Sequence, residues 1–449
     1  MHSRLVIFAL TLTLVGQVLA QDAAPSFARE IAPILLKKCL VCHGPDKQKG
    51  NYRLDTFEAL NKPGASKLAP VVAGQPDKSN LFQLLTSPDN DDRMPQKDEP
   101  LPDAQIALIR RWIQAGANFD GTARTAPLAA LIPKGAHPAP PQIYAQPVPA
   151  LALDFSHDGQ ELAVSGYREI TIWNSGTGEL LRRITNLAQR TQGLAYSPDG
   201  AVLAAASGDP GQAGEVTLMD PKKGVVVKSL VTLPDLALDV KFNADGTRLA
   251  AGCADNSIRI FNVASGQMER RIDQHADWVM AVAWSPDGTH LASASRDRSA
   301  RVFSLEKGEL EQSYFGHGAA VFTVAFSADG KEVITGGRDK KIHIWSVKDA
   351  KKKFEVGGFE DDVLRLLLHD GHIFNGSADK TVREHSEKAT WIRTFAGHVD
   401  WVYSLAIHAP SKHLATGDFS GEIRIWNLED GKLLKTFTAA PGWVNAKAK

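Results

Sequence analysis

Cysteine is scarce in this chain, with three residues among 449, which excludes a small fold held together by several disulfide bonds. Neither sign of charge dominates, because 51 lysines and arginines balance 51 aspartates and glutamates. A chain without net charge gives no electrostatic reason to expect a nucleic-acid or membrane-surface partner. After residue 20 no apolar run reaches the roughly 18–20 residues that a transmembrane helix needs. The length predicts two or more domains.

The first 20 residues have the features of a secretory signal peptide. A short positive segment ending at Arg4 precedes an apolar run over 5–18, and Ala20 offers a small residue at the cleavage point. The run is too short to span a bilayer. Removal of Arg4 would leave a mature chain, 21–449, with 51 − 1 = 50 basic and 51 acidic residues. We therefore expect a periplasmic or otherwise exported protein.

One short motif carries specific chemistry, Cys39-Leu-Val-Cys42-His43. Two thiols at this spacing can each add across a haem vinyl group, and the adjacent histidine then lies beneath the iron as its proximal ligand. Haem attachment of this kind is completed outside the bacterial cytoplasm, which agrees with the predicted export. The His43 Nδ1–H is expected to donate to a backbone carbonyl such as that of Pro45. The motif predicts one covalent haem c.

Three other uses of the same motif remain as alternatives. A structural zinc site needs a second pair of ligands, which the N-terminal region does not supply. A thioredoxin-like dithiol would lie in a βαβ unit and would not use the histidine. A Cys39–Cys42 disulfide is compatible with a precursor that has not received its haem.

The second axial ligand follows by elimination. Between Gln21 and Ala136, His43 is the only histidine and Met94 the only methionine. Met94 precedes Pro95 in a turn-like stretch, where a thioether can be held over the far haem face. His/Met ligation raises the reduction potential and leaves no open position, which suits electron transfer. The alternative is that Met94 is an ordinary core residue.

Helical periodicity flanks the motif. Apolar residues over 27–36 lead into Cys39, and Gly44-Pro45 should end that helix. A second helix is predicted over 103–116, with Asp103 as its N-cap and Trp112 in the core.

Residues 27–119 resemble the planctomycete-type cytochrome c domain. The resemblance rests on Ile31-x-Pro33-Ile34-Leu35, Cys39-x-x-Cys42-His43-Gly44-Pro45, Arg53-Leu54-Asp55, Gly74-x-Pro76-x-x-Ser79-x-Leu81, Met94-Pro95 and Leu108-Ile109-x-x-Trp112-Ile113-x-x-Gly116-Ala117. It shows no departure among the expected haem ligands. It implies a haem-binding electron carrier in an exported protein.

A self-similar unit repeats through the C-terminal two thirds of the chain. Its mark is a Ser/Asn-x-Asp-Gly turn that ends at Gly159, Gly200, Gly246, Gly288 and Gly330, and degenerate copies follow at 369–371 and 408–411. Successive glycines from 159 to 371 are 41, 46, 42, 42 and 41 residues apart. This period, with four short strands in each unit, predicts a β-propeller with seven blades.

These repeats resemble the WD-repeat family. Glycine–histidine pairs stand at Gly316-His317 and Gly397-His398, and Trp173, Trp345 and Trp426 stand at the tryptophan–aspartate position. The resemblance implies a structural hydrogen-bond tetrad in blade 5, formed by His317, Thr335, Asp339 and Trp345. It also implies that blade 4 loses its tryptophan to Phe303 and that blade 7 has Ser420 in place of the aspartate. The histidines and aspartates are therefore interpreted as blade supports.

Smaller expectations concern the edges of the propeller. Residues 433–437 should supply the last strand of blade 7, and 143–145 should add an edge strand that helps to close the ring. Residues 208–215 should form a longer loop in blade 2, and Cys253 should be a small buried residue. His137 should be a solvated residue of a linker that contains six prolines.

The sequence thus predicts a multidomain chain, with a signal peptide (1–20), a small all-α cytochrome module (21–120), a proline-rich linker (121–147), an all-β seven-bladed propeller (148–442) and a tail (443–449). Its expected function is electron transfer through one haem c bound by Cys39 and Cys42 and ligated by His43 and Met94, with the propeller docking redox partner proteins. One alternative is an oxidoreductase whose propeller passes substrate electrons to the haem, although no blade shows a catalytic constellation. Another is a haem sensor, which would require Met94 to leave the iron.

Overall fold

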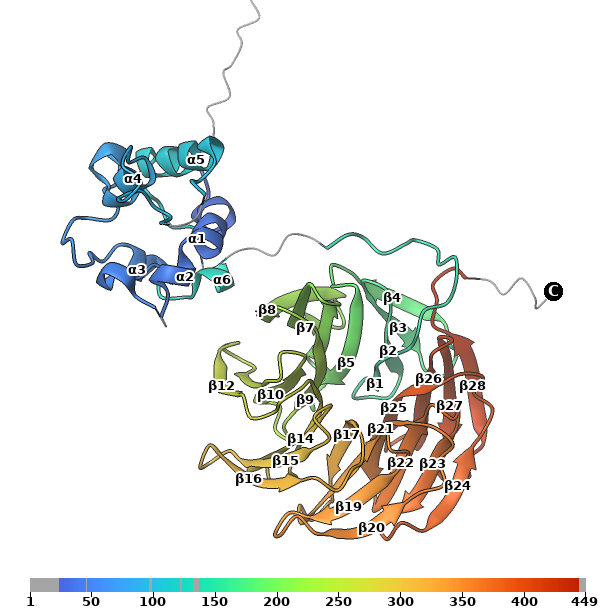
Figure 1. Ribbon diagram of the computed structural model, residues 1–449. Coiled ribbons are helices and arrows are strands. Elements are labelled where there is room, and N and C mark those ends of the chain that lie inside the picture. Colours follow the sequence, from blue (N-terminus) through green and yellow to red (C-terminus); the bar gives the residue numbers. More distant parts are fainter. Residues whose placement is uncertain (1–23, 46, 97–98, 122, 132–136, 444–449) are drawn as a thin grey trace, which may run out of the picture. The chain divides into compact units, whose positions relative to one another are not determined.

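The computed structural model describes residues 24–45, 47–96, 99–121, 123–131 and 137–443. The chain divides into two compact units, 1–135 and 136–449 (Figure 1). The predicted signal peptide lies outside the described residues. Within the described ranges, no helix has both the length and the apolar character needed to cross a bilayer.

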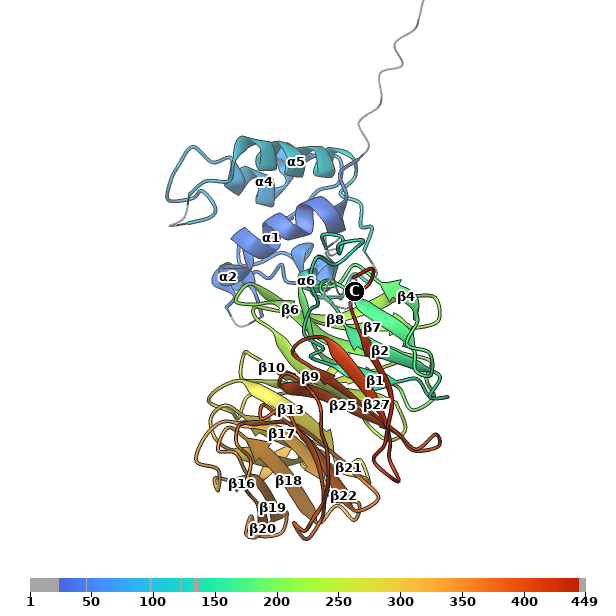
Figure 2. The same ribbon diagram turned by 90° about the vertical axis from the view of Figure 1, so that its right-hand side faces the viewer.

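The first unit is built from short helices and contains no β-strand among its described residues. Its elements are the π-helix η1 Phe27–Ile31, α1 Ala32–Lys38, α2 Leu40–His43, the 3₁₀ turns η2 Lys49–Asn51 and η3 Pro76–Lys78, α3 Phe57–Leu60, α4 Asn80–Leu85, α5 Asp103–Gln114 and α6 Leu128–Leu131. α5 lies beside α4 (Figures 1 and 2). Long irregular stretches separate these helices, so the unit is less regular than the all-α expectation.

Aromatic packing joins the first helix of this unit to α3 and α5. The Phe27 ring lies 5.4 Å from that of Trp112 and 4.7 Å from that of Phe57. Trp112 is 1% exposed, and its indole N–H donates to the Asn118 carbonyl over 3.0 Å, so its predicted core role is confirmed. Asp103 is not the N-cap of α5: Pro102 occupies that position, and Asp103 is the first helical residue, where its charge favours the helix dipole.

The segment expected to be an extended linker, 121–147, is largely held by the two units. Leu128 and Leu131 of α6 are buried in the core of the first unit. Tyr144 is 4% exposed in the second unit, where its hydroxyl donates to Glu169 over 2.6 Å and its N–H donates to the Pro441 carbonyl over 3.1 Å. The high proline content of this segment suggested an extended linker, although these apolar residues pack into the cores of the two units.

His137 is likewise not a solvated linker residue. Its side chain is only 20% exposed, and its Nε2 lies 3.3 Å from a carboxylate oxygen of Glu215. Its backbone N–H donates to the Asn186 side chain over 2.8 Å. This part of the chain therefore belongs structurally to the propeller.

The second unit consists of seven four-stranded antiparallel sheets, which confirms the predicted seven-bladed propeller. Blade 1 contains β1 Leu153–Phe155, β2 Glu161–Ser165, β3 Ile170–Asn174 and β4 Leu180–Ile184; blade 2, β5 Arg190–Tyr196, β6 Leu203–Asp209, β7 Ala213–Asp220 and β8 Val225–Leu233; blade 3, β9 Ala237–Phe242, β10 Arg248–Cys253, β11 Ile258–Asn262 and β12 Met268–Ile272. Blade 4 contains β13 Val279–Trp284, β14 His290–Ser295, β15 Ala300–Ser304 and β16 Glu309–Tyr314; blade 5, β17 Val321–Phe326, β18 Glu332–Gly337, β19 Ile342–Ser346 and β20 Lys352–Val356. Blade 6 contains β21 Val363–His369, β22 His372–Ser377, β23 Val382–Ser386 and β24 Trp391–Phe395; blade 7, β25 Val402–His408, β26 His413–Asp418, β27 Glu422–Asn427 and β28 Leu433–Thr438.

The sequence pattern of each blade follows its burial. The second and third strands are covered on both faces by neighbouring blades, so strands such as β2 and β3 are almost continuously buried. The fourth strands, such as β12 and β20, are mostly exposed. The Asp-Gly turns between the first two strands have glycine in the left-handed region, with φ of 69° at Gly159.

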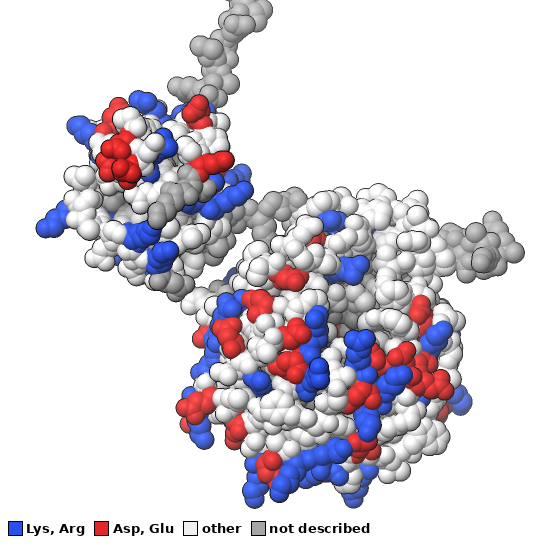
Figure 3. Space-filling view, in the orientation of Figure 1, with Lys and Arg blue, Asp and Glu red and all other residues white. Residues whose placement is uncertain are grey.

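On the face shown in Figure 3, positive and negative side chains are interspersed.

The ring is closed without exchange of a strand between blades. Each sheet contains four consecutive strands, and β28 completes blade 7 as predicted. Residues 143–145 form no strand, contrary to expectation. Instead, the Ala150 N–H donates to the Asp418 carbonyl over 3.1 Å, and the Ser404 hydroxyl donates to the Ala150 carbonyl over 2.7 Å. These bonds form the seam between blades 7 and 1.

Two other details of the propeller can be compared with the sequence. The long loop expected over 208–215 is a hairpin, because β6 and β7 continue into it and leave only 210–212 as the turn. Cys253 lies in β10 and is fully buried, as expected.

The tetrads differ from blade to blade. In blade 5, His317 bonds Asp339 over 2.9 Å and Thr335 over 2.8 Å. Trp345 does not complete this tetrad: within the described structure its buried indole N–H has no partner, and its ring instead stacks on Tyr314 at 4.9 Å. The predicted tetrad of blade 5 is therefore three-membered.

Blade 7 holds the complete tetrad, contrary to expectation. His398 bonds Asp418 over 3.0 Å and Thr416 over 2.7 Å, and the Trp426 indole N–H donates to Thr416 over 2.9 Å. The aspartate comes from a position two residues before Ser420, and the Ser420 hydroxyl donates to it over 2.6 Å. A fully buried carboxylate at the end of β26 thus replaces one from the following turn.

Because the tetrads of blades 5 and 7 differ, replacing the threonine by valine should lower the free energy of unfolding by different amounts in these two blades. Thr416→Val leaves both His398 Nε2 and the Trp426 N–H without partners, whereas Thr335→Val affects only His317. Because each buried polar group without a partner costs about 1–3 kcal/mol, T416V should lower the free energy of unfolding by that amount more than T335V. Urea denaturation followed by circular dichroism measures both. Equal losses would contradict the assignment of the complete tetrad to blade 7.

Buried histidines predict an acid-sensitive propeller. Burial lowers the pKa of His343 to about 4, helped by the charges of His317 and Lys352, and burial also lowers the pKa of His385 to about 4. Since the ordinary pKa of histidine is about 6.5, the unfolded chain binds more protons than the folded one between about pH 6.5 and pH 4. The free energy of unfolding should therefore be fully retained above this window and fall as the pH drops through it, by up to about 3 kcal/mol for each histidine.

A matched variant isolates the contribution of His343. The equivalent positions in blades 3 and 6 are Arg259 and Arg383, which pair at 2.8 Å with Asp255 and Asp379. The substitution His343→Arg offers Asp339 the same partner and removes the titrating imidazole. Urea denaturation at pH 6.5 and 4.5 should show a smaller loss for H343R than for the parent. An unchanged pH dependence would contradict this account.

Candidate haem-binding site

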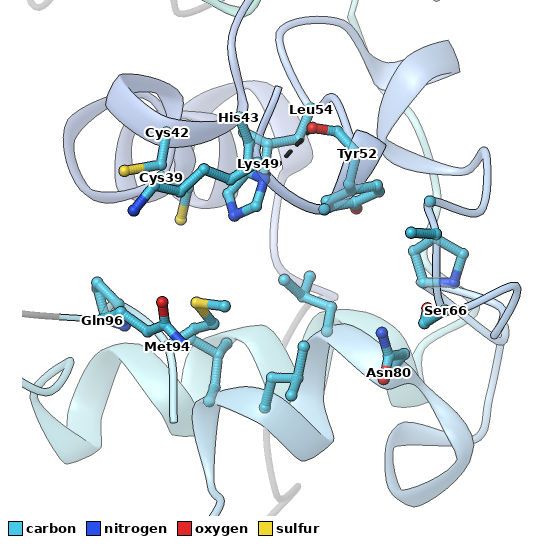
Figure 4. Close-up of a pocket in the computed structure, with 18 of the residues that line it drawn as sticks. Cys39, Cys42, His43, Lys49, Tyr52, Leu54, Ser66, Asn80, Met94 and Gln96 are labelled. Atoms are coloured by element: carbon cyan, nitrogen blue, oxygen red, sulfur yellow. Dashed lines mark hydrogen bonds between the residues drawn. The ribbon is translucent and has the colours of Figure 1, made fainter. Parts of the chain in front are cut away.

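A cavity of about 480 Å³ lies inside the first unit, and all four predicted ligand residues line it. Cys39, Cys42 and His43 are on one wall, and Met94 is on the opposite wall (Figure 4). In this view the His43 ring and the Met94 side chain point toward each other across the cavity. Residues that are 51 positions apart in the sequence are thus brought together without any other histidine or methionine nearby.

Helix geometry explains the placement of the first three residues. Cys39 separates α1 from α2, and Cys42 and His43 lie in the last turn of α2. Positions three and four apart on a helix share a face, so the two thiols and the imidazole open into the same space. Gly44 then ends the helix, and any side chain there would bring a Cβ within 2.7 Å of the Leu40 carbonyl oxygen. The predicted stop at Gly44-Pro45 is confirmed.

The imidazole is held from behind by a carbonyl other than the expected one. His43 Nδ1 lies 3.3 Å from the carbonyl oxygen of Tyr52, whereas the Pro45 carbonyl accepts from Gln48 over 3.2 Å. The chain turns back after η2, and the Leu54 N–H donates to the His43 carbonyl over 3.0 Å, which brings Tyr52 behind the ring. A proton on Nδ1 leaves the Nε2 lone pair free to bind a metal in the cavity.

Tyr52 also fixes this wall through its side chain. Its ring lies 5.5 Å from the His43 ring, and its hydroxyl donates to the Leu60 carbonyl over 2.8 Å. Burial, followed by the charge of Cys39, raises the pKa of Tyr52, so the hydroxyl stays protonated as a donor. Sequence reasoning missed Tyr52, because no local pattern shows that it would lie behind His43.

The Cys39 thiol is held in its protonated form at neutral pH. Burial and the neighbouring Cys42 raise the pKa of Cys39 to about 12. Because the thiolate is the form that attacks disulfides, a thiol with this pKa is poorly suited to a redox dithiol. The electrostatics of Cys39 therefore argue against that alternative to haem attachment.

Met94 is positioned by its backbone. Its N–H donates to the Leu84 carbonyl over 2.9 Å, which ties it to the end of α4, and the preceding Arg93 N–H donates to the Asp89 carbonyl over 2.9 Å. The side chain is half-buried and lines the cavity. The same walls carry apolar residues, Leu54, Leu68, Pro70, Leu81, Leu84, Leu85 and Pro95. Their packing gives a thioether a dry environment opposite the imidazole.

Polar residues gather at the end of the cavity away from the cysteines. Ser66 and Asn80 lie there in Figure 4. Sequence reasoning did not identify them, because single polar residues in separate segments give no recognisable motif. They offer hydrogen-bond donors beside the apolar residues of the walls.

Comparison with known families matches both units. The model for WD domain, G-beta repeat matches residues 230–262, 266–304, 308–346 and 389–427, so these segments of the propeller are WD repeats. The model for Planctomycete cytochrome C matches residues 39–98, which contain the two cysteines, His43 and Met94. The chain therefore places a segment similar to that family before its propeller, as the sequence resemblance indicated.

Individual relatives match only part of the chain. It is 34% identical over 85 residues to Nuclear distribution protein PAC1 of Tuber melanosporum, covering 17% of this chain and 19% of that protein. It is 30% identical over 88 residues to Nuclear distribution protein nudF 1 of Talaromyces marneffei, covering 19% of each. The chain thus spans about a fifth of the length of these curated relatives.

Proposed function

We propose that this protein is an exported c-type cytochrome that carries one covalent haem and transfers electrons, with its propeller as a docking scaffold for partner proteins. The observation that carries the proposal is the cavity of about 480 Å³ with the Cys39-x-x-Cys42-His43 motif on one wall and Met94 on the other. The expected export rests on the signal-peptide features of residues 1–20. In this proposal the first unit is a small helical cytochrome module.

The residues that line the cavity are suited to each chemical part of a haem. Cys39 and Cys42 would hold the porphyrin through two thioether bonds, and His43 Nε2 and the Met94 sulfur would ligate the iron. The apolar leucines would cover the macrocycle, and Ser66 and Asn80 would face its propionates at the opposite end from the cysteines. A bound haem would supply one-electron redox chemistry, and the protein would supply orientation, an apolar cavity and two iron ligands.

The propeller supports the docking part of the proposal. Its loops are supported by rigid sheets, an arrangement that suits partner binding. The histidines of blades 5 and 7 bond their own aspartates and threonines, which supports their interpretation as blade supports.

The proposal is tested on the full-length protein exported by a host that attaches haem c. Pyridine haemochrome spectra should show one covalent haem in each chain, and a redox titration should follow a single one-electron transition. The reduced protein should not change its spectrum with carbon monoxide, because both axial positions are filled. A mature protein without covalent haem would end the proposal.

A further inference from the structure

A second cavity, of about 290 Å³, opens at one mouth of the propeller channel. Each blade contributes a residue near the start of its innermost strand, and most of these residues are apolar: Leu151, Gln192, Leu238, Met280, Phe322, Leu364 and Tyr403. The side of the cavity formed by blades 6 and 7 differs from the rest, because it carries Trp401 together with Asp361 and Asp362.

Trp401 and Tyr403 of this side lie together with a third aromatic ring, that of Phe419, which does not itself line the cavity. Trp401 lies 6.3 Å from Tyr403 and 5.9 Å from Phe419, and Tyr403 lies 5.7 Å from Phe419. Trp401 and Phe419 are 43% and 44% exposed, which is unusual for large apolar side chains held on rigid strand ends. Aromatic faces that remain open to solvent are suited to binding a cation.

Two carboxylates accompany these rings. Within the described residues, Asp362 has neither a hydrogen bond nor an ion pair to its carboxylate, and Asp400 bonds only the N–H of the next residue, Trp401, over 2.8 Å. Burial raises the pKa of Tyr403, and the charges of Asp362 and Asp400 raise it further, which places both carboxylates near that ring. The cation of the cavity, Arg365, is already paired with Asp239 at 3.0 Å.

Blade 4 contains the same local arrangement, but there an arginine of the protein itself contacts the tryptophan and the aspartate. There, Asp277 bonds the N–H of Trp278 over 2.8 Å, as Asp400 does with Trp401. In blade 4 the Arg296 N–H donates to the Trp278 carbonyl, and in blade 7 the Phe419 N–H donates to the Trp401 carbonyl. Arg296 and Phe419 therefore occupy equivalent positions. The Arg296 guanidinium lies 4.1 Å from the centre of the Trp278 ring and 3.3 Å from the Asp277 carboxylate. Blade 7 has the aspartate and the tryptophan but no arginine of its own at this position.

We propose that the blade 6–7 side of this channel mouth binds an arginine side chain of a partner protein. A planar guanidinium can stack on Trp401 while donating to Asp400 or Asp362, and arginine performs both tasks better than the more strongly hydrated ammonium of lysine. The inference deepens the docking role proposed for the propeller, and it names the chemistry of the contact. It does not depend on the haem.

The test measures peptide binding to the full-length protein by isothermal titration calorimetry. The probes are acetyl-Gly-Ser-Arg-Ser-Gly-amide and the same peptide with citrulline or lysine in place of arginine. Citrulline keeps the shape of arginine but has no charge, so its peptide should bind at least about tenfold more weakly. Asp362→Asn, which preserves the side-chain size, should weaken the arginine peptide about tenfold.

A variant that places an arginine of the protein itself in this site gives the clearer test. Phe419→Arg supplies the guanidinium that blade 4 already has and should abolish saturable peptide binding. The control is Phe315→Arg, which makes the same change at a phenylalanine that is 69% exposed. Among the described ring contacts, Phe315 touches neither Trp401 nor Tyr403, as Phe419 does, so this variant should leave affinity within about twofold. No saturation with the arginine peptide, or equal affinity for the citrulline or lysine peptide, would overturn the proposal. Loss of covalent haem with intact peptide binding would instead refute only the electron-transfer function.

Discussion

Joint replacement of Cys39 and Cys42 by serine is expected to remove covalent haem from this protein completely. Each thiol supplies one thioether bond, and the cavity offers no other sulfur except that of Met94, which cannot form this bond. Any haem that still enters the cavity would be held by axial ligation and apolar contacts alone. Acid–acetone extraction should then remove all pigment from the double variant and none from the parent.

Cys253→Ser provides the matched control. Cys253 is the third cysteine of the chain and is buried in β10 of the propeller, so its replacement changes the same atom outside the haem cavity. C253S should keep its pigment after extraction. Single variants at Cys39 or Cys42 should retain one thioether, with a pyridine haemochrome band between those of free and doubly attached haem. Pigment that survives extraction in the double variant would disprove covalent attachment through this motif.

Met94→Leu is expected to open one axial position of the iron. Leucine preserves the volume of the side chain but provides no donor atom, so the reduced variant should bind carbon monoxide while the parent does not. Because a thioether ligand raises the reduction potential, the potential of M94L should fall by a substantial part of the roughly 0.8 V range that axial ligation controls. Optical titration with carbon monoxide and potentiometry measure the two effects.

The control for this variant is Met268→Leu. Met268 is 49% exposed on β12 of the propeller, and its replacement should leave both the potential and the carbon monoxide response unchanged. A parent-like potential in M94L, with no response to carbon monoxide, would mean that another group ligates the iron. No histidine other than His43 lies in the described part of the first unit, so such a result would also challenge the cavity itself as the haem site.

Local chemistry made much of this structure predictable. The Asp-Gly turn of blades 1 to 5 forms its hydrogen bonds within five residues: in blade 1, Asp158 accepts from Ser156 over 2.6 Å and from the Gln160 N–H over 3.0 Å. Such a turn can be recognised wherever it recurs, and its period indicates the propeller. The spacing of Cys39, Cys42 and His43 is equally local, since one helical turn places them on the same face.

The errors concern contacts between distant parts of the chain. The Tyr52 carbonyl replaces that of Pro45 behind His43 because the chain doubles back after η2, which no local pattern shows. Asp418 takes the place of the aspartate that is missing at position 420. A carboxylate at the end of β26 reaches His398 as well as one from the following turn would. Leu128 and Tyr144 seemed to belong to a linker because the composition of a segment does not reveal which core its few apolar residues enter.

The closure of the propeller by a seam has a further consequence. Since each sheet contains four consecutive strands, every covalent break between blades would leave all seven sheets intact. The two ends of the ring are adjacent, as the bond from Tyr144 to Pro441 shows. The propeller is therefore suited to circular permutation: joining these ends and cutting any inter-blade connection would exchange one seam for another without dividing a blade.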